Sequence, residues 1–258
     1  MKLLRSLCMA FAMYSRIPAP RVEWKAENMA YALCFFPLIG AFIGLMWLGW
    51  LHLAALLGFG SILTAAVASL IPLVLTGGIH MDGFLDTADA LFSRAPREKK
   101  LEILKDSRSG AGAVISCAAY LLVSFALWTE APRAGGALWA LLLTPVLSRA
   151  LSALAVVTFP AAKRDGLLVS FQSAAQKTAV RVTCAVWIAL CASLMLWLHP
   201  LCGALAALAS LMAYLWYYLM ARRQFGGTTG DLAGWFVQVC ELLALCAVAV
   251  CARIGGLV

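Results

Sequence analysis

The sequence predicts an all-α protein: a polytopic helical bundle embedded in a membrane. The first observation is composition, because 64% of the 258 residues are hydrophobic and only 12% are charged, against about 25% charged in an ordinary soluble domain. The second is that the apolar residues form long continuous runs, whereas a membrane β-barrel has alternating segments of about ten residues. These observations exclude a soluble globular enzyme, a disordered chain and a disulfide scaffold.

Seven apolar runs are long enough to cross a bilayer, which takes about 20 residues, so we expect about seven transmembrane helices, within a range of six to eight. They cover residues 33–57, 61–78, 111–129, 136–159, 179–198, 201–220 and 232–252. The turn at 58–60 is so short that the first two should form a helical hairpin. We expect one membrane-embedded domain over residues 1–258, in which residues 1–27 form an N-terminal segment at the cytoplasmic interface.

The distribution of basic residues sets the predicted orientation. With the N-terminus in the cytoplasm, 17 of the 20 Lys and Arg residues fall on cytoplasmic segments, Arg133 and Arg253 fall outside, and Arg149 lies within a span. This asymmetry is typical of multi-pass proteins of the inner (cytoplasmic) membrane. The net charge of +8 is thus interpreted as a topology signal, and no nucleic-acid partner is expected.

The nine cysteines show no metal or disulfide pattern. All but Cys8 lie in apolar runs, and none forms a Cys-x-x-Cys pair. We interpret them as small apolar side chains that fill contacts between helices.

The densest group of acids lies directly after the second predicted span. Asp82, Asp86 and Asp89 have helical offsets of 0, 4 and 7, which place them within about 60° on one helix face. Like charges at such spacing destabilise a helix, and a divalent cation removes that repulsion. Oxygen ligands without cysteine favour Mg²⁺, with Mn²⁺ as the alternative, over zinc.

Two plainer interpretations of this segment stay open. The acids can belong to a solvated loop in which they pair with Arg94, Arg97 and Lys99. His80 is a candidate catalytic base or ligand, but the favoured interpretation is a hydrogen-bonded histidine at the membrane interface.

Residues 97–112 form the second polar cluster. The first part has the pattern of an amphipathic helix, and the turn around Asp106 opens a glycine-containing helix start. A helix N-terminus favours phosphate, and Lys105 and Arg108 add charged donors. The alternative is an ordinary positively charged cytoplasmic loop.

The third cluster is the Gly/Thr-rich loop at 226–234, which supplies Thr229 and Asp231 at the start of the last span. Glu241 follows about three helical turns later. Ionisable residues inside a membrane are costly and usually functional, and Arg149 is the candidate partner of Glu241.

Together the clusters combine carboxylates for a metal with Lys, Arg and helix ends for phosphate. Metal ions neutralise a diphosphate and stabilise its leaving group, and basic groups hold its oxygens. The residues therefore predict a membrane-embedded, Mg²⁺-dependent transferase that acts on a diphosphate substrate, without choosing that substrate.

Three long motifs resemble the adenosylcobinamide-GDP ribazoletransferase family, also called cobalamin synthase. They read GGIHMDGFLDTADALF, REKKLEILKDSRSGAGAV and GGTTGD with a later Glu. Smaller matches are Ser15-Arg16-Ile17-Pro18, Arg149 and Arg164-Asp165-Gly166-Leu167. The resemblance covers nearly the whole chain. The family often has a small residue at position 235 and an acid at 238, where this chain has Trp235 and Gln238, so the resemblance implies no role for that turn.

The resemblance implies a reaction and a set of site residues. A hydroxyl of α-ribazole, or of its 5′-phosphate, attacks the corrinoid-side phosphate of adenosylcobinamide-GDP, GMP leaves, and adenosylcobalamin or its 5′-phosphate forms late in cobalamin biosynthesis. The implied ligands of metal and diphosphate are Asp82, Asp86, Asp89 and Asp106. Lys105, Arg108 and Asp231 are implied in the same site, and we add Thr229 and Arg16 as substrate-binding candidates.

Two rival classes remain at this stage. One is another Mg²⁺-dependent membrane transferase, such as a prenyltransferase or a CDP-alcohol phosphotransferase, although the latter pattern needs an Arg after Asp82-Gly83 that this chain lacks. The other is a cation transporter, which places carboxylates near the midplane of several spans. The active site is expected on the cytoplasmic face, and the sequence leaves open whether the protein is a homo-oligomer.

Overall fold

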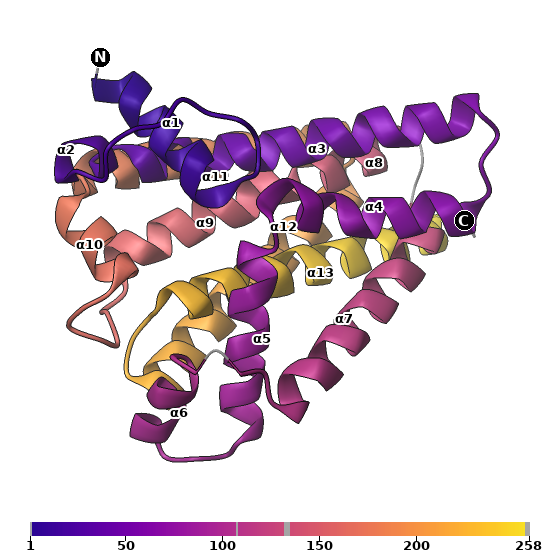
Figure 1. Cartoon of the computed structure of the whole chain (residues 1–258). Coiled ribbons are helices and arrows are strands. Elements are labelled where there is room, and N and C mark those ends of the chain that lie inside the picture. The colour runs from indigo at the N-terminus through magenta and orange to yellow at the C-terminus, as the bar shows by residue number, and fades with distance from the viewer. Residues whose placement is uncertain (1, 107, 132–134, 256–258) are drawn as a thin grey trace.

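The computed structural model describes residues 2–106, 108–131 and 135–255, and within these ranges every regular element is a helix (Figure 1). The helices are α1 Lys2–Tyr14, α2 Ala26–Met29, α3 Ala32–Leu56, α4 Ser61–Thr76, α5 Ile79–Phe92, α6 Arg97–Ile103, α7 Ala111–Glu130, α8 Gly135–Leu142, α9 Thr144–Thr158, α10 Leu167–Ala174, α11 Lys177–Leu198, α12 Pro200–Met220 and α13 Gly230–Gly255. A π-helical turn, Ala221–Phe225, continues α12. The predicted all-α class is confirmed. Ser107, in the predicted phosphate-binding turn, and Arg133, assigned to an outside loop, lie outside the described residues.

Within the described residues, six helical segments are long and apolar enough to cross a membrane. They are α3, α7, α8 with α9, α11, α12 with its π-helical turn, and α13. These correspond to six of the seven predicted spans. The remaining prediction, at 61–78, corresponds to α4, which passes the same test only together with α5, and the two helices meet at 96°.

Two glycines cause the right angle between α4 and α5. Gly77 (φ 64°) and Gly78 (φ 79°) both adopt the left-handed conformation, which other residues enter only with strain. Gly77 ends α4 in the manner of a C-terminal helix cap. Figure 1 shows α5 running across the direction of α3, α4 and α13. Because α5 does not continue the direction of α4, we treat it as lying outside the membrane-spanning segments.

The predicted hairpin of the first two spans is confirmed by hydrogen bonds between α3 and α4. The indole Nε1 of Trp47 donates to the Ala68 carbonyl at 2.8 Å, and that of Trp50 donates to the Thr64 carbonyl at 2.9 Å. Buried indole N–H groups need such partners, so these two bonds fix the register of the hairpin.

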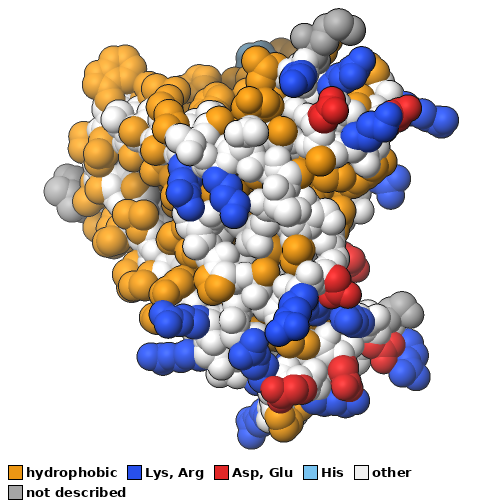
Figure 2. Space-filling model, turned by 90° about the vertical axis from the view of Figure 1, so that its left-hand side faces the viewer, with side chains coloured by type: hydrophobic (Ala, Val, Ile, Leu, Met, Phe, Trp, Pro, Cys, Tyr) orange, Lys and Arg blue, Asp and Glu red, His pale blue; other side chains and the backbone are white. Residues whose placement is uncertain are grey.

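The outer surface of the bundle is apolar. Large side chains such as Trp197, Leu56 and Ile62 are 79%, 75% and 71% exposed, which suits a lipid surface and not water. Figure 2 views the molecule from the left-hand side of Figure 1, where Lys, Arg, Asp and Glu side chains gather and hydrophobic ones collect toward one margin. In this view most of the charged groups form one set at the upper right and another at the bottom, with mostly uncharged surface between them.

A buried ion pair joins α9 to α13. Arg149 and Glu241 are only 1% and 6% exposed, and their Nη1 and Oε1 atoms lie 2.5 Å apart. Ser148 donates to the same carboxylate oxygen at 2.7 Å, and Arg149 also donates to the Pro145 carbonyl at 3.0 Å. The partnership predicted from the sequence is confirmed.

Removing one partner of this pair should destabilise the protein strongly. Arg149→Met leaves the Glu241 carboxylate buried without compensation, and breaking a buried pair typically costs about 3–5 kcal/mol. We expect a large fall in melting temperature in detergent for Arg149→Met and for Glu241→Leu. The double variant should recover much of the loss, because no lone charge stays buried. Single variants that melt like the wild type would contradict this role.

Candidate active site

A cavity of about 290 Å³ opens where α5 meets the start of α13. Its polar wall comes from α5, from the 163–166 loop and from the 228–231 segment, and includes Asp82, Lys163 and Asp231. Its apolar wall comes from α1, α3, α9 and α10. The cavity lining is therefore amphiphilic, since it combines charged groups with aromatic and aliphatic ones.

Two glycines bring α5 and α13 into close contact beside this cavity. A Cβ atom on Gly83 would lie 2.6 Å from the Asp231 carbonyl oxygen, and one on Gly234 would lie 3.1 Å from the His80 carbonyl oxygen. Any larger side chain at position 83 would push the backbones apart. This close contact places Asp231 against α5, the helix that carries Asp82 and Asp86, although Asp231 and α5 are far apart in the sequence.

The carboxylates at this junction repel one another. The pKa of Asp86 is raised from 3.8 to about 6, first by partial burial and then by the charges of Asp82, Asp231 and Asp89, against a smaller opposing effect of Lys163. Among the described residues, none of these four carboxylates lies within 4.0 Å of a Lys or Arg nitrogen. The alternative in which they pair with Arg94, Arg97 and Lys99 is therefore not what the structure shows.

Asp89 has a second role that the sequence did not reveal. Its Oδ2 accepts a hydrogen bond from the backbone N–H of Gly110 at 3.1 Å, so this carboxylate caps the start of α7. A Cβ atom on Gly110 would fall 2.3 Å from the carboxylate. The helix start that was predicted to receive phosphate thus already carries the negative group that its N–H donors favour.

Asp106 and Arg108, predicted as metal ligand and phosphate ligand, bind each other. The Arg108 Nη2 and Asp106 Oδ2 atoms are 2.8 Å apart, Arg108 Nε and its backbone N–H also donate to Asp106 Oδ1, and both side chains face solvent. These hydrogen bonds lower the pKa of Asp106 to about 2. Neither residue is among the described residues that line the cavity.

Lys163 is the site residue that sequence reasoning missed. It lines the cavity. Burial is the main cause that lowers its pKa, and repulsion by Lys105 lowers it further. The charges of Asp231, Asp165 and Asp86 oppose this shift. Backbone bonds tie its loop to the third cluster: Thr228 N–H donates to the Pro160 carbonyl at 2.8 Å, and Ala162 N–H donates to the Thr228 carbonyl at 2.9 Å. Its position beside the Arg164–Leu167 match was the available signal.

The predicted residues Thr229, Arg16 and His80 have different surroundings. Thr229 lines the cavity, and its hydroxyl accepts from the Leu232 N–H at 3.3 Å at the start of α13. Arg16 lies against Gly77 at the α4–α5 turn, is exposed, and is not among the described cavity residues.

His80 lines the cavity wall but is almost fully buried, with its Nε2 atom lacking a hydrogen-bond partner among the described residues. Burial, followed by the charge of Arg149, lowers its pKa. The imidazole is therefore neutral, and the interpretation of His80 as a hydrogen-bonded interfacial residue does not agree with its unpartnered Nε2.

The fold and this cavity define a polytopic helical membrane protein with carboxylates and a lysine at one end of the bundle. The model of the cobalamin-5-phosphate synthase family matches residues 6–249, and the chain belongs to that family.

Three relatives carry the name adenosylcobinamide-GDP ribazoletransferase. The protein of Lachnoclostridium phytofermentans is 44% identical over 97% of this chain and 95% of its own length. The Desulfitobacterium hafniense protein is 32% identical over 94% of this chain and 95% of its own length. The protein of Clostridium perfringens strain 13 is 30% identical over 93% of this chain and 96% of its own length. No solved structure matches the chain.

The raised pKa of Asp86 predicts a pH-dependent effect on stability. Because the folded pKa of about 6 exceeds the ordinary 3.8, the folded state binds more protons between these values, and its stability falls as the pH rises through that window. Asp86→Asn should therefore raise the melting temperature of chelator-treated protein at pH 7.5, and this gain should shrink toward pH 4. Glu98→Gln, on the exposed face of α6, is the control. A gain for Asp86→Asn that is equal at every pH would disprove the repulsion.

Proposed function

We propose that this protein transfers α-ribazole, or its 5′-phosphate, to adenosylcobinamide-GDP with release of GMP, the activity named for its relatives. The observation that carries the proposal is the cavity whose lining combines carboxylates, a lysine and a helix N-terminus with apolar side chains. In this reaction a ribazole hydroxyl oxygen forms a bond to the corrinoid-side phosphorus. The bond from that phosphorus to GMP breaks, and the hydroxyl proton is released. The comparisons give no support to a prenyltransferase, a CDP-alcohol phosphotransferase or a transporter.

Mg²⁺, or Mn²⁺ in its place, suits the donor chemistry of the carboxylates at the α5–α13 junction. The ion would have to draw them together, because no three of these described carboxylates have ligand atoms that all lie within 4.8 Å of one another. The donor set is all oxygen, and the mutual repulsion around Asp86 is what a divalent cation would relieve. We assign Asp82, Asp86 and Asp231 to this ion, since Asp89 is bound to Gly110 and Asp106 to Arg108. When bound, such an ion neutralises diphosphate charge and stabilises the leaving group.

The chain's own basic groups orient the diphosphate. Lys163 lies in the cavity wall beside Asp231, and the backbone at Gly230 opens α13 toward the same space. A helix N-terminus and an ammonium group both favour phosphate oxygens. Lys105 is not among the described residues that line the cavity, but it lies near enough to Lys163 to lower its pKa, so it adds positive charge beside that lysine. Arg108 would reach phosphate only after leaving Asp106.

The apolar wall suits the planar base of ribazole. Tyr14, Phe36 and Phe171 supply aromatic surface to the cavity lining. The volume of about 290 Å³ is at the low end of small-molecule sites, which run from about 300 to 1,000 Å³. We therefore place the smaller substrate inside and the corrinoid ring at the mouth, where its diphosphate reaches Lys163.

Activity in liposomes given both substrates tests the metal assignment. Chelation should abolish turnover, and Mg²⁺ or Mn²⁺ should restore it. Asp86→Asn should lower kcat by about 100-fold or more, because it removes a charged ligand from the stabilising ion. The matched control is Glu98→Gln, an acid of the same charge on exposed α6, which should turn over like the wild type. Full activity in excess chelator would refute the metal assignment. Failure to form any cobalamin product from these substrates would refute the function itself.

The proposed orientation places the cavity on the cytoplasmic face of the cell membrane, as the distribution of Lys and Arg favours. Single reporter cysteines in a cysteine-free background test it. A reporter at Arg164 should react only with reagent supplied from the cytoplasm, because this loop borders the cavity. A reporter at Gly58, in the α3–α4 turn, should react only from outside. The reverse pattern would overturn the orientation.

A further inference from the structure

A second cluster of metal-binding side chains lies at the opposite end of the bundle. Among the described residues, His199, Cys202 and Cys251 form the one group of at least three His, Cys, Asp or Glu side chains whose ligand atoms all lie within 4.8 Å of one another. Cys251 follows Asp231 by 20 residues along α13, about 30 Å for a helix. The cluster is thus remote from the carboxylates.

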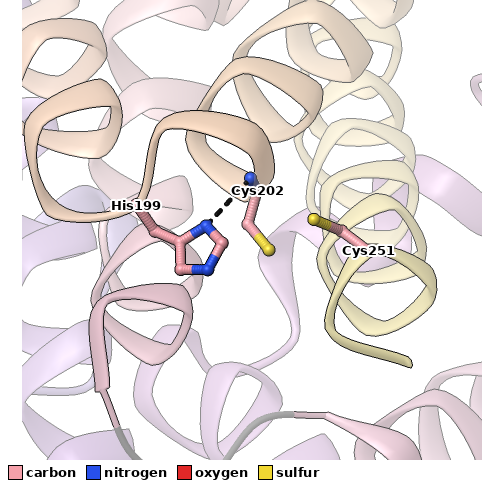
Figure 3. Close-up of side chains that lie close together, drawn as sticks. All are labelled: His199, Cys202 and Cys251. Carbon is pink, nitrogen blue, oxygen red and sulfur yellow. Dashed lines mark hydrogen bonds between the residues drawn. The ribbon is translucent and has the colours of Figure 1, made fainter. Parts of the chain in front are cut away.

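The three ligands come from two parts of the fold, the start of α12 and the end of α13. His199 forms the α11–α12 turn, Cys202 lies in the first turn of α12, and Cys251 lies near the end of α13. Figure 3 shows the two sulfurs pointing toward each other between α12 and α13, with the imidazole on the far side of Cys202. Cys202 is 0% and Cys251 is 2% exposed, while His199 is half-buried. An ion would therefore enter past the histidine.

We propose that this cluster is a Zn²⁺ site. Two thiolates and one imidazole form a donor set typical of zinc, with water or a substrate atom in the fourth position. Charge favours Zn²⁺ over Cu⁺ here, because two thiolates neutralise a divalent ion and leave no net charge in an apolar region. The ideal bond lengths of about 2.3 Å to sulfur and 2.0–2.1 Å to nitrogen require only a modest approach of the three side chains.

Zinc binding has a defined chemical balance. Both thiol protons leave to solvent as the two Zn–S bonds form, and no electrons are transferred. The Nδ1 atom of His199 accepts a hydrogen bond from the Cys202 backbone N–H at 3.2 Å and so caps α12. A neutral imidazole has one lone-pair nitrogen, so binding at either ring nitrogen ends this cap. In exchange the ion ties the α11–α12 turn to the end of α13.

The test uses full-length protein in detergent, stripped of metal under reducing conditions and titrated with Zn²⁺ against a competing chelator. We expect one Zn²⁺ per chain, a higher melting temperature on binding, and an affinity that rises by about two orders of magnitude per pH unit near neutrality, because two protons are released. Cys202→Ser and Cys251→Ser should each weaken this binding by at least 100-fold.

Two further variants keep the result interpretable. Cys246→Ser changes another cysteine of α13 outside the cluster and should bind zinc like the wild type. If Cys202→Ser does not fold, His199→Gln tests the same site from the α11–α12 turn. We expect His199→Gln to weaken zinc binding as well. Wild-type zinc binding no tighter than that of Cys251→Ser would overturn the site. So would a Cys202–Cys251 disulfide, found by mass spectrometry, that persists in protein purified from cells.

Discussion

The close approach of α5 to α13 is the constraint on which the site depends. Gly83 and Gly234 let the two backbones meet, and Asp231 is then held against a helix that already carries Asp82 and Asp86. Packing alone would not place like charges together, since their repulsion opposes it. The rest of the bundle must therefore supply the stability that holds them there, and a ligand of opposite charge would relieve the strain.

The Arg149–Glu241 pair fixes how two of the helices in that bundle lie against each other. It joins α9 to α13 in the interior, where Glu241 accepts from both Arg149 and Ser148, while the Arg149 Nε has no hydrogen-bond partner among the described residues. The same helix, α13, carries Asp231 at one end, this ion pair in the middle and Cys251 near the other end. One helix thus connects the carboxylate site, the bundle core and the proposed zinc site.

Much of this arrangement could be predicted from local sequence. The apolar runs gave six spans close to their observed limits, because a bilayer fixes helix length. The spacing of Asp82, Asp86 and Asp89 gave one helix face, and Arg149–Glu241 was identifiable because lone charges are rare in spans. The 96° turn after α4 could not be predicted: two glycines permit such a turn, but the packing of neighbouring helices sets its angle.

Contacts between segments that are distant in the sequence could not be predicted either. Lys163 reaches the cavity because backbone hydrogen bonds join its loop to Thr228, and Asp89 accepts a hydrogen bond from Gly110, 21 residues away.

The central claim, that α5 and α13 together hold a divalent cation, is tested most directly by Mn²⁺ binding measured by electron paramagnetic resonance. We expect wild-type protein to bind Mn²⁺ that Mg²⁺ displaces, and Asp231→Asn to bind at least ten-fold more weakly. Unchanged binding in Asp231→Asn would contradict the account.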